Sequence, residues 1–168
     1  MLVLGLDPGL AITGYGLVKE SPSGKLELLT YGAITTPAWE PLPKRLLRID
    51  RELGSLIIEY GPDVVAVEEL FFCKNVTTAL IVGQARGVTI LAAARNGLTV
   101  YEYKPMAVKQ AISGYGKAPK SQVQEMVRML LDLDEVPQPD DAADGLAVAI
   151  CHLHNARLNN MINRQQAR

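Results

Sequence analysis

The feature that most constrains this chain is an acidic residue at the end of its first apolar run. Residues 2–6 are continuously apolar, Asp7-Pro8-Gly9 follows, and a second apolar run covers residues 11–18. This pattern predicts a strand, a tight turn and a second strand, the first of them buried in the middle of a sheet. An ionised group at the buried end of a strand costs several kcal/mol unless a partner, usually a cation, offsets it. Asp7 is therefore either a metal ligand or an acceptor for turn amides, and other carboxylates must decide between these roles.

Length and composition indicate a single domain with a well-filled core. The chain has 168 residues, 48% of them hydrophobic, and a mean hydropathy of +0.10. Its net charge of -1 gives no overall basic character. Cys73 and Cys151 have no CxxC spacing, so neither a disulfide framework nor a zinc site is predicted, and a reducing, cytoplasmic location is expected. The N-terminal run has no basic leader, so neither a signal peptide nor a membrane span is expected.

The order of apolar patterns predicts an α/β domain with a mixed sheet flanked by helices. Strands are expected at residues 2–6, 11–18, 25–35, 63–70 and 98–103. Helices are expected at residues 44–60, 77–96, 105–112, 119–131 and 140–157. The first three strands form an antiparallel meander and the last two are parallel strands, which gives one domain over residues 1–157. The polar tail, residues 158–168, is expected to be frayed.

Acidic residues occur at the ends of three apolar elements. Asp7 ends the first strand, Glu68 or Glu69 ends the fourth, and Asp141 and Asp144 lie one helical turn apart at the start of the last helix. Crowded carboxylates raise one another's pKa values and destabilise a fold unless a cation is bound. Oxygen-only ligand sets suit Mg²⁺ or Mn²⁺, and two such ions can activate a water and stabilise the leaving oxygen of a phosphodiester. The acids therefore predict a metal-dependent nuclease.

Two neighbouring acids require a choice. Strand alternation places Glu68 on the same face as the small Ala66, which slightly favours Glu68 over Glu69 as the ligand. Asp140, at the start of the last helix, is assigned to capping or to solvent.

Several ordered segments, taken together, resemble one known family. The chain is similar to the RuvC family of bacterial Holliday junction resolvases, which belong to the ribonuclease H-like nuclease superfamily. The likeness covers nearly the whole chain. It is carried by the segments LGLDPGLAITGYGLV, PDVVAVEELFF, GQARGV, VYEYKPMAVKQAISGYGKAPKSQVQEMV and DDAADGLAVAICH.

The resemblance implies a function, a cofactor and partners. The family's metal-binding acids fall on Asp7, Glu68, Asp141 and Asp144, which resolves the choice in favour of Glu68. The third of these positions is histidine in some relatives and aspartate here. The implied activity is a pair of symmetric, Mg²⁺-dependent nicks in strands of like polarity at a four-way DNA junction, during recombination and repair. Two Mg²⁺ ions per site, replaceable by Mn²⁺, a homodimer and the RuvA-RuvB branch-migration complex are implied as well, with no membrane partner.

DNA contacts are expected near the candidate acids. The chain's two phenylalanines, Phe71 and Phe72, follow the fourth strand and either close the core or contact DNA. The family likeness favours Phe71 as the residue that stacks on an unpaired base. It also assigns DNA contacts to Lys109 and Lys120, and Lys117 lies in a loop that is expected to touch DNA.

Other conspicuous residues are predicted to be structural. Trp39 is expected to pack within its proline-rich segment, and Cys151 to lie in the core. His152 is also read as structural, although a role in activating water stays open. The helix at residues 77–96 is rich in small residues and is expected to pack closely against the sheet or against a second subunit. A different ribonuclease H-like nuclease and an inactive DNA-binding module are the competing functions.

Overall fold

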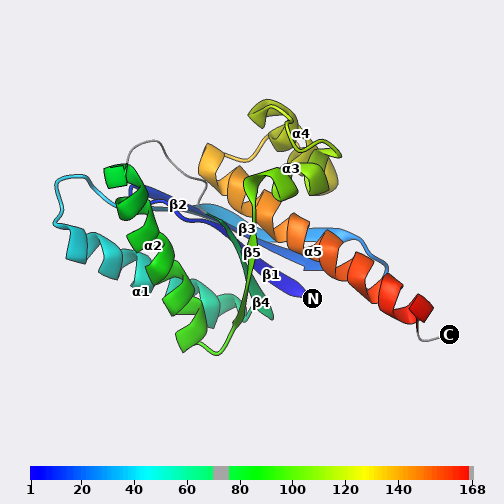
Figure 1. Cartoon of the computed structure of the whole chain (residues 1–168), viewed down its shortest axis with the longest axis horizontal. Helices are drawn as coiled ribbons and strands as arrows, with labels where there is room; N and C mark the ends of the chain where they lie inside the picture. The colour runs from blue at the N-terminus through cyan, green and yellow to red at the C-terminus, as the bar shows by residue number, and fades with distance from the viewer. Residues whose placement is uncertain (70–75, 167–168) are drawn as a thin grey trace.

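A five-stranded mixed sheet forms the centre of the computed structural model, which describes residues 1–69 and 76–166 (Figure 1). Its strand order is β3-β2-β1-β4-β5. β1 pairs antiparallel with β2 and β2 antiparallel with β3, whereas β1–β4 and β4–β5 are parallel, as predicted. The strand bounds are β1 Leu2–Asp7, β2 Ile12–Glu20, β3 Leu26–Thr35, β4 Val64–Glu68 and β5 Thr99–Tyr103.

Helices cover both faces of the sheet, α1 and α2 on one and α3, α4 and α5 on the other (Figure 1). Their bounds are α1 Leu42–Tyr60, α2 Val76–Arg95, α3 Pro105–Ser113, α4 Lys120–Leu130 and α5 Asp140–Gln166. Each face has its own apolar core, because successive side chains of a strand point to opposite faces. In β1, for example, Val3 packs on the α5 side, whereas Leu4 and Leu6 pack on the side of α1 and α2.

Two predictions about the chain's periphery are wrong. The last helix does not end at Arg157 but continues to Gln166, so most of the tail expected to fray is helical. Residues 158–166 contain neither glycine nor proline, and a polar composition alone does not end a helix. Trp39 does not pack: its side chain is 82% exposed. It lies in a surface turn between Pro37 and Pro41, where none of the described helices and strands covers it.

Candidate active site

Helix α5 begins directly over the sheet because glycines remove the side chains that would hold it away. A Cβ atom at Gly5 of β1 would collide with the backbone oxygen of Gly145, and one at Gly14 of β2 with that of Asp141. A Cβ atom at Gly145, on the helix, would lie 2.8 Å from the backbone of Tyr15. The first turns of α5 therefore lie against the ends of β1 and β2.

Strand alternation aims the strand-end acids at this helix. Val3 and Gly5 of β1 face α5, so Asp7 lies on the same face. In β4, Ala66 belongs to the core beneath α5, which puts Glu68 on that side as well. β1 and β4 are adjacent and parallel, so both acids lie at one edge of the sheet, under the start of α5.

The pKa values of the acids reflect this crowding. Burial, followed by the charges of Asp144 and Asp141, raises the pKa of Asp7 to about 6. Burial, followed by the charges of Asp7 and Asp144, raises the pKa of Glu68 to about 7. Burial also raises the pKa of Asp144. The four predicted acids therefore share one electrostatic environment, although they come from three separate elements.

Two lysines supply positive charge to the same place. Lys120, the first residue of α4, places its Nζ atom 2.9 Å from Oδ2 of Asp144 and 3.5 Å from Oδ2 of Asp140. Lys109 of α3 lowers the pKa of Glu68 in opposition to burial. Glu68, Lys109, Lys120 and Asp144 all line one cavity of about 210 Å³. Asp140, assigned from sequence to capping or to solvent, is an ion-pair partner of Lys120.

The donor set fits a hard divalent cation. Within residues 1–69 and 76–166, no three His, Cys, Asp or Glu side chains lie close enough together to hold a metal ion as they stand. The four acids nevertheless offer oxygen ligands only, which is what Mg²⁺ and Mn²⁺ prefer. The raised pKa values of Asp7, Glu68 and Asp144 indicate that negative charge there is incompletely compensated, although the Lys120 ammonium already lies close to Asp144.

The residues that the sequence predicts to contact DNA lie in different parts of the structure. Lys109 and Lys120 line the cavity beside the acids. Lys117 lies in the exposed turn between α3 and α4 and is absent from the cavity lining. Phe71 and Phe72 fall outside the described residues.

His152 has a structural environment that the sequence does not reveal. Its side chain is buried, and its Nδ1 atom lies 2.8 Å from the hydroxyl of Tyr103. The ring also packs against Tyr101, at a centroid distance of 4.5 Å, and burial lowers the pKa of the imidazole. These contacts favour a neutral histidine that supports β5 over one that activates water.

The crowded acids predict a pH-dependent stability in the absence of metal. The folded-state pKa values of Asp7 and Glu68, about 6 and about 7, exceed the ordinary values of 3.8 and 4.5. Ionisation of both groups therefore opposes folding. The free energy of unfolding falls as the pH rises from the ordinary pKa values to the folded-state pKa values, and the loss is complete above about pH 8. In EDTA, the Tm should fall by roughly 5 to 10 °C between about pH 5.5 and pH 8. Circular dichroism during thermal unfolding measures this fall in Tm.

Two controls accompany that measurement. Addition of Mg²⁺ should reduce the fall in Tm, because a bound cation stabilises the ionised acids. The double variant Asp7→Asn/Glu68→Gln should show little pH dependence over the same range in EDTA. A wild-type Tm that does not change with pH would mean that the acids are not crowded.

Comparison with known proteins identifies the family. Residues 3–152 match the family described as "Crossover junction endodeoxyribonuclease RuvC". The RuvC of Alkaliphilus oremlandii is 55% identical over 161 residues, covering 96% of this chain and 98% of the relative. That of Heliobacterium modesticaldum is 60% identical over 155 residues, covering 92% and 95% of the two chains.

Solved structures agree with the sequence comparison. Thermus thermophilus RuvC in complex with a Holliday junction substrate superposes with a TM-score of 0.87 at 38% identity, covering 94% of this chain and 96% of that one. The yeast mitochondrial Holliday junction resolvase Ydc2 has a TM-score of 0.71 at 17% identity, over 98% and 83% of the two chains, which shows a shared fold alone. This chain, which has the ribonuclease H-like fold, belongs to the RuvC family of crossover junction endodeoxyribonucleases.

Proposed function

We propose that this protein resolves four-way DNA junctions by paired, symmetric nicks in strands of like polarity, in recombination and repair. The observation that carries the proposal is a cavity lined by Glu68, Asp144 and two lysines, in a chain of the RuvC family. Asp7 lies close enough to both acids for their charges to interact. A related protein of the same fold, Thermus thermophilus RuvC, is described in complex with a Holliday junction.

The acids and the lysines have separate roles in this reaction. Asp7, Glu68, Asp141 and Asp144 would hold two Mg²⁺ ions, or Mn²⁺ in their place. Such ions, when bound, supply an activated water and stabilisation of the leaving oxygen. Lys109 and Lys120 orient the scissile phosphate and offset its charge. Because Lys120 pairs with Asp144, its ammonium is already held beside the ligand set before DNA arrives.

The exposed side of α2 supports a homodimer. Its apolar side chains include Leu80 and Leu91, which are 65% and 53% exposed, although α2 also packs against α1 through buried small residues. Gly87 lies on the same side, and a Cβ atom placed there meets no atom of the described residues within 4 Å. Positions 80, 84, 87, 91 and 94 repeat with helical spacing and form a stripe, which we call the α2 face. An exposed, largely apolar stripe with Gly87 at its centre suits close packing against the same helix of a second copy.

The same apolar helix does not indicate a membrane protein. By length and composition α2 is long and apolar enough to cross a bilayer. A single helix of this kind is weak evidence of a membrane span. In addition, α2 carries Arg86, which pairs with Glu102 of β5 in the folded domain. A cytoplasmic location and an association with the RuvA-RuvB complex complete the proposal.

The activity is tested on an end-labelled four-way junction and a duplex of matching sequence. With Mg²⁺, a denaturing gel should show symmetric nicks in the junction and none in the duplex, and EDTA should abolish them. Cleavage of both substrates would instead favour a general nuclease. Binding of the junction without cleavage under any metal condition would favour an inactive binding module.

A further inference from the structure

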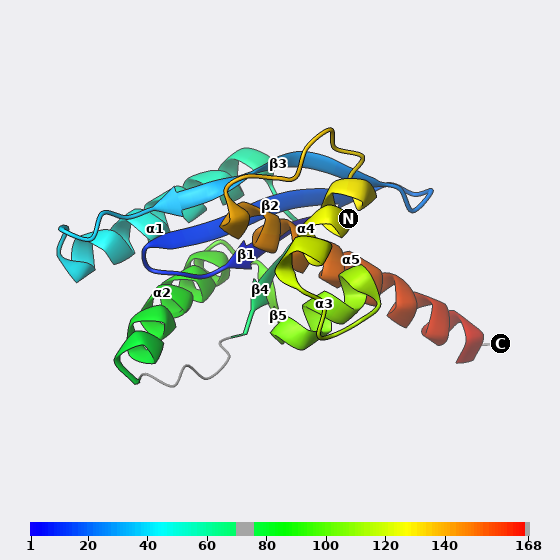
Figure 2. The same cartoon turned by 90° about the horizontal axis from the view of Figure 1, so that it is seen from above.

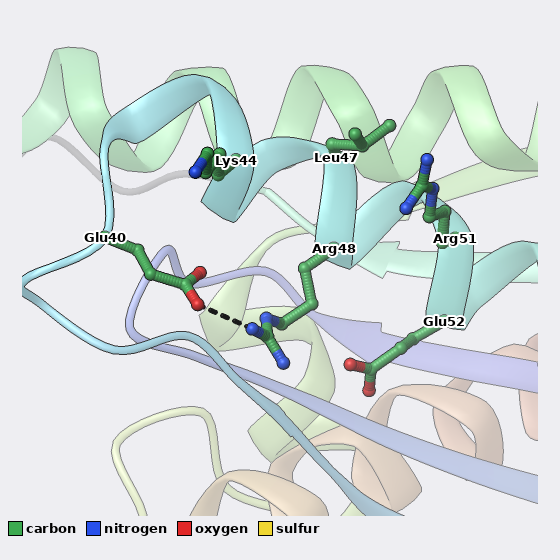
Figure 3. Close-up of a pocket in the computed structure, with 6 residues that line it drawn as sticks. All are labelled: Glu40, Lys44, Leu47, Arg48, Arg51 and Glu52. Carbon is green, nitrogen blue, oxygen red and sulfur yellow. Dashed lines mark hydrogen bonds and ion pairs between the residues drawn. The ribbon is translucent and has the colours of Figure 1, made fainter.

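A groove on α1 combines positive charge with an accessible surface, and none of the roles assigned so far uses it. The groove has a volume of about 490 Å³ and lies along the first half of the helix (Figure 3). Lys44, Arg48 and Arg51 line it at spacings of four and three residues, so they lie along one side of α1. Leu47, between them, is 45% exposed.

The acidic residues of the groove leave its cations available. Glu40 accepts a hydrogen bond from Arg48 at 2.7 Å (Figure 3). The Glu40 side chain is only 12% exposed, whereas that of Arg48 is 42% exposed. The carboxylate is therefore largely covered and holds in place a guanidinium that remains accessible. Glu52 is the other acid in the lining, so three cations face two acids.

The groove lies at the same end of the sheet as the candidate active site, but on the opposite face, because α1 covers one face and α5 covers the other. β1 and β3 both pair antiparallel with β2, so they run in the same direction, and Figure 2 shows the chain running on from the end of β3 to the start of α1. In the register of the sheet, Gly14 pairs with Asp7 on one side and with Ala33 on the other. Since adjacent strands are about 4.8 Å apart, Ala33 lies roughly 10 Å from Asp7. The chain therefore leaves β3 for α1 at the end of the sheet where the acids lie.

Hydrogen bonds fix this connection to the loop that follows Asp7. The hydroxyl of Thr36 donates to the carbonyl oxygen of Leu10, and the amide of Thr36 donates to that of Ala11 at 2.9 Å. From α1, Nε of Arg45 donates to the Thr36 hydroxyl oxygen at 2.8 Å. The start of α1 is therefore held in a fixed position relative to the active-site loop.

The connection also carries the most exposed large hydrophobic side chain of the described residues. Trp39 is 82% exposed and immediately precedes Glu40, which lines the groove. A large aromatic side chain beside a row of cations is a combination that nucleic-acid-binding surfaces use, because the ring packs on sugars or bases while the cations bind phosphates.

We propose that Lys44, Arg48, Arg51 and Trp39 form a second DNA-binding surface, which holds the sugar–phosphate backbone of a junction arm at the end of the sheet where the active site lies. This inference rests on the proposed function, because it supposes a DNA junction at the acids. Duplex DNA carries one negative charge per about 1.7 Å of its axis, so an arm entering beside Asp7 presents phosphates to this end. The fixed fork of Arg48 suits bidentate phosphate contact, and Lys44 and Arg51 extend the positive surface along α1.

The first test uses the intrinsic fluorescence of Trp39, the only tryptophan of the chain. The probe is a four-way DNA junction in EDTA, and a labelled copy of the junction reports binding independently by anisotropy. In the free protein, acrylamide should quench Trp39 efficiently. In the bound protein, the quenching constant should fall by about twofold or more, because a ring that packs on DNA is shielded from solvent.

The second test measures the salt dependence of junction binding. The variant Lys44→Ala/Arg51→Ala should reduce the slope of log K against log salt by about 0.9 for each phosphate contact that is lost. Arg48 is kept, because its removal would leave the largely covered Glu40 without its partner. The matched control is Lys19→Ala/Lys25→Ala, which removes two exposed lysines at the opposite edge of the sheet and should leave the slope unchanged.

The outcomes separate this inference from the proposed function. A junction that binds and is cleaved, while Trp39 stays open to acrylamide and the double variant keeps the wild-type slope, would overturn the second surface and leave the function standing. The groove would then serve a partner other than DNA. A protein that binds no junction at all would overturn both proposals.

Discussion

Replacement of Asp7 by asparagine is expected to abolish junction cleavage while junction binding survives. The substitution keeps the shape of the side chain but removes one charge from the ligand set. Loss of a metal ligand removes several kcal/mol of transition-state stabilisation, so the cleavage rate should fall by roughly 10³-fold or more. Binding should be retained or become tighter, because the acid no longer repels the phosphate backbone.

Cleavage rates under single-turnover conditions and native-gel binding measure the two effects separately. Asp134→Asn, which removes an exposed acid after α4, is the matched control and should behave as wild type. In EDTA at neutral pH, Asp7→Asn should also raise the Tm, because the ionised Asp7 opposes folding. Retained cleavage would mean that Asp7 is no ligand, and a variant with a lowered Tm that has lost binding as well would indicate a folding defect.

Sequence patterns were sufficient for the sheet and for the orientation of its acids. The apolar run before Asp7 indicated a central strand, and β1 lies between β2 and β4. Alternation along β4 indicated that Ala66 and Glu68 share a face, and Ala66 packs beneath α5. Both arguments work because a strand has a strict period of two residues, so one buried position fixes the direction of its neighbours.

Features that depend on tertiary packing cannot be predicted from local sequence patterns. The pairing of Lys120 with Asp144 joins the start of α4 to α5, and no local pattern predicts it. The exposure of Trp39 depends on whether another element covers its turn, which composition does not reveal. The spacing of Lys44, Arg48 and Arg51 places them on one side of a helix, but no local pattern shows that this helix begins at the end of the sheet that carries the acids.

Charged residues on the α2 face are expected to separate the proposed dimer. In a two-fold symmetric interface each substitution occurs twice, so the variant Leu80→Glu/Leu91→Glu places four carboxylates in the contact. Burial of one leucine contributes about 1.5 to 3 kcal/mol, so the dimer Kd should rise by about 10³-fold or more. Sedimentation velocity measures the change. Met129→Glu, at a 60% exposed position of α4, is the matched control and should leave the protein dimeric.

The same variant connects assembly to the outcome of the reaction. A monomer retains its acids and lysines, so it should still nick a junction, but a single site cannot cut two strands in one encounter. A junction labelled on both strands should therefore yield nicked junctions rather than paired duplex products. A variant that remains dimeric would remove α2 from the interface. A monomeric variant that still yields paired products would show that symmetric cleavage does not depend on the α2 contact, because two sites could then act without being held together.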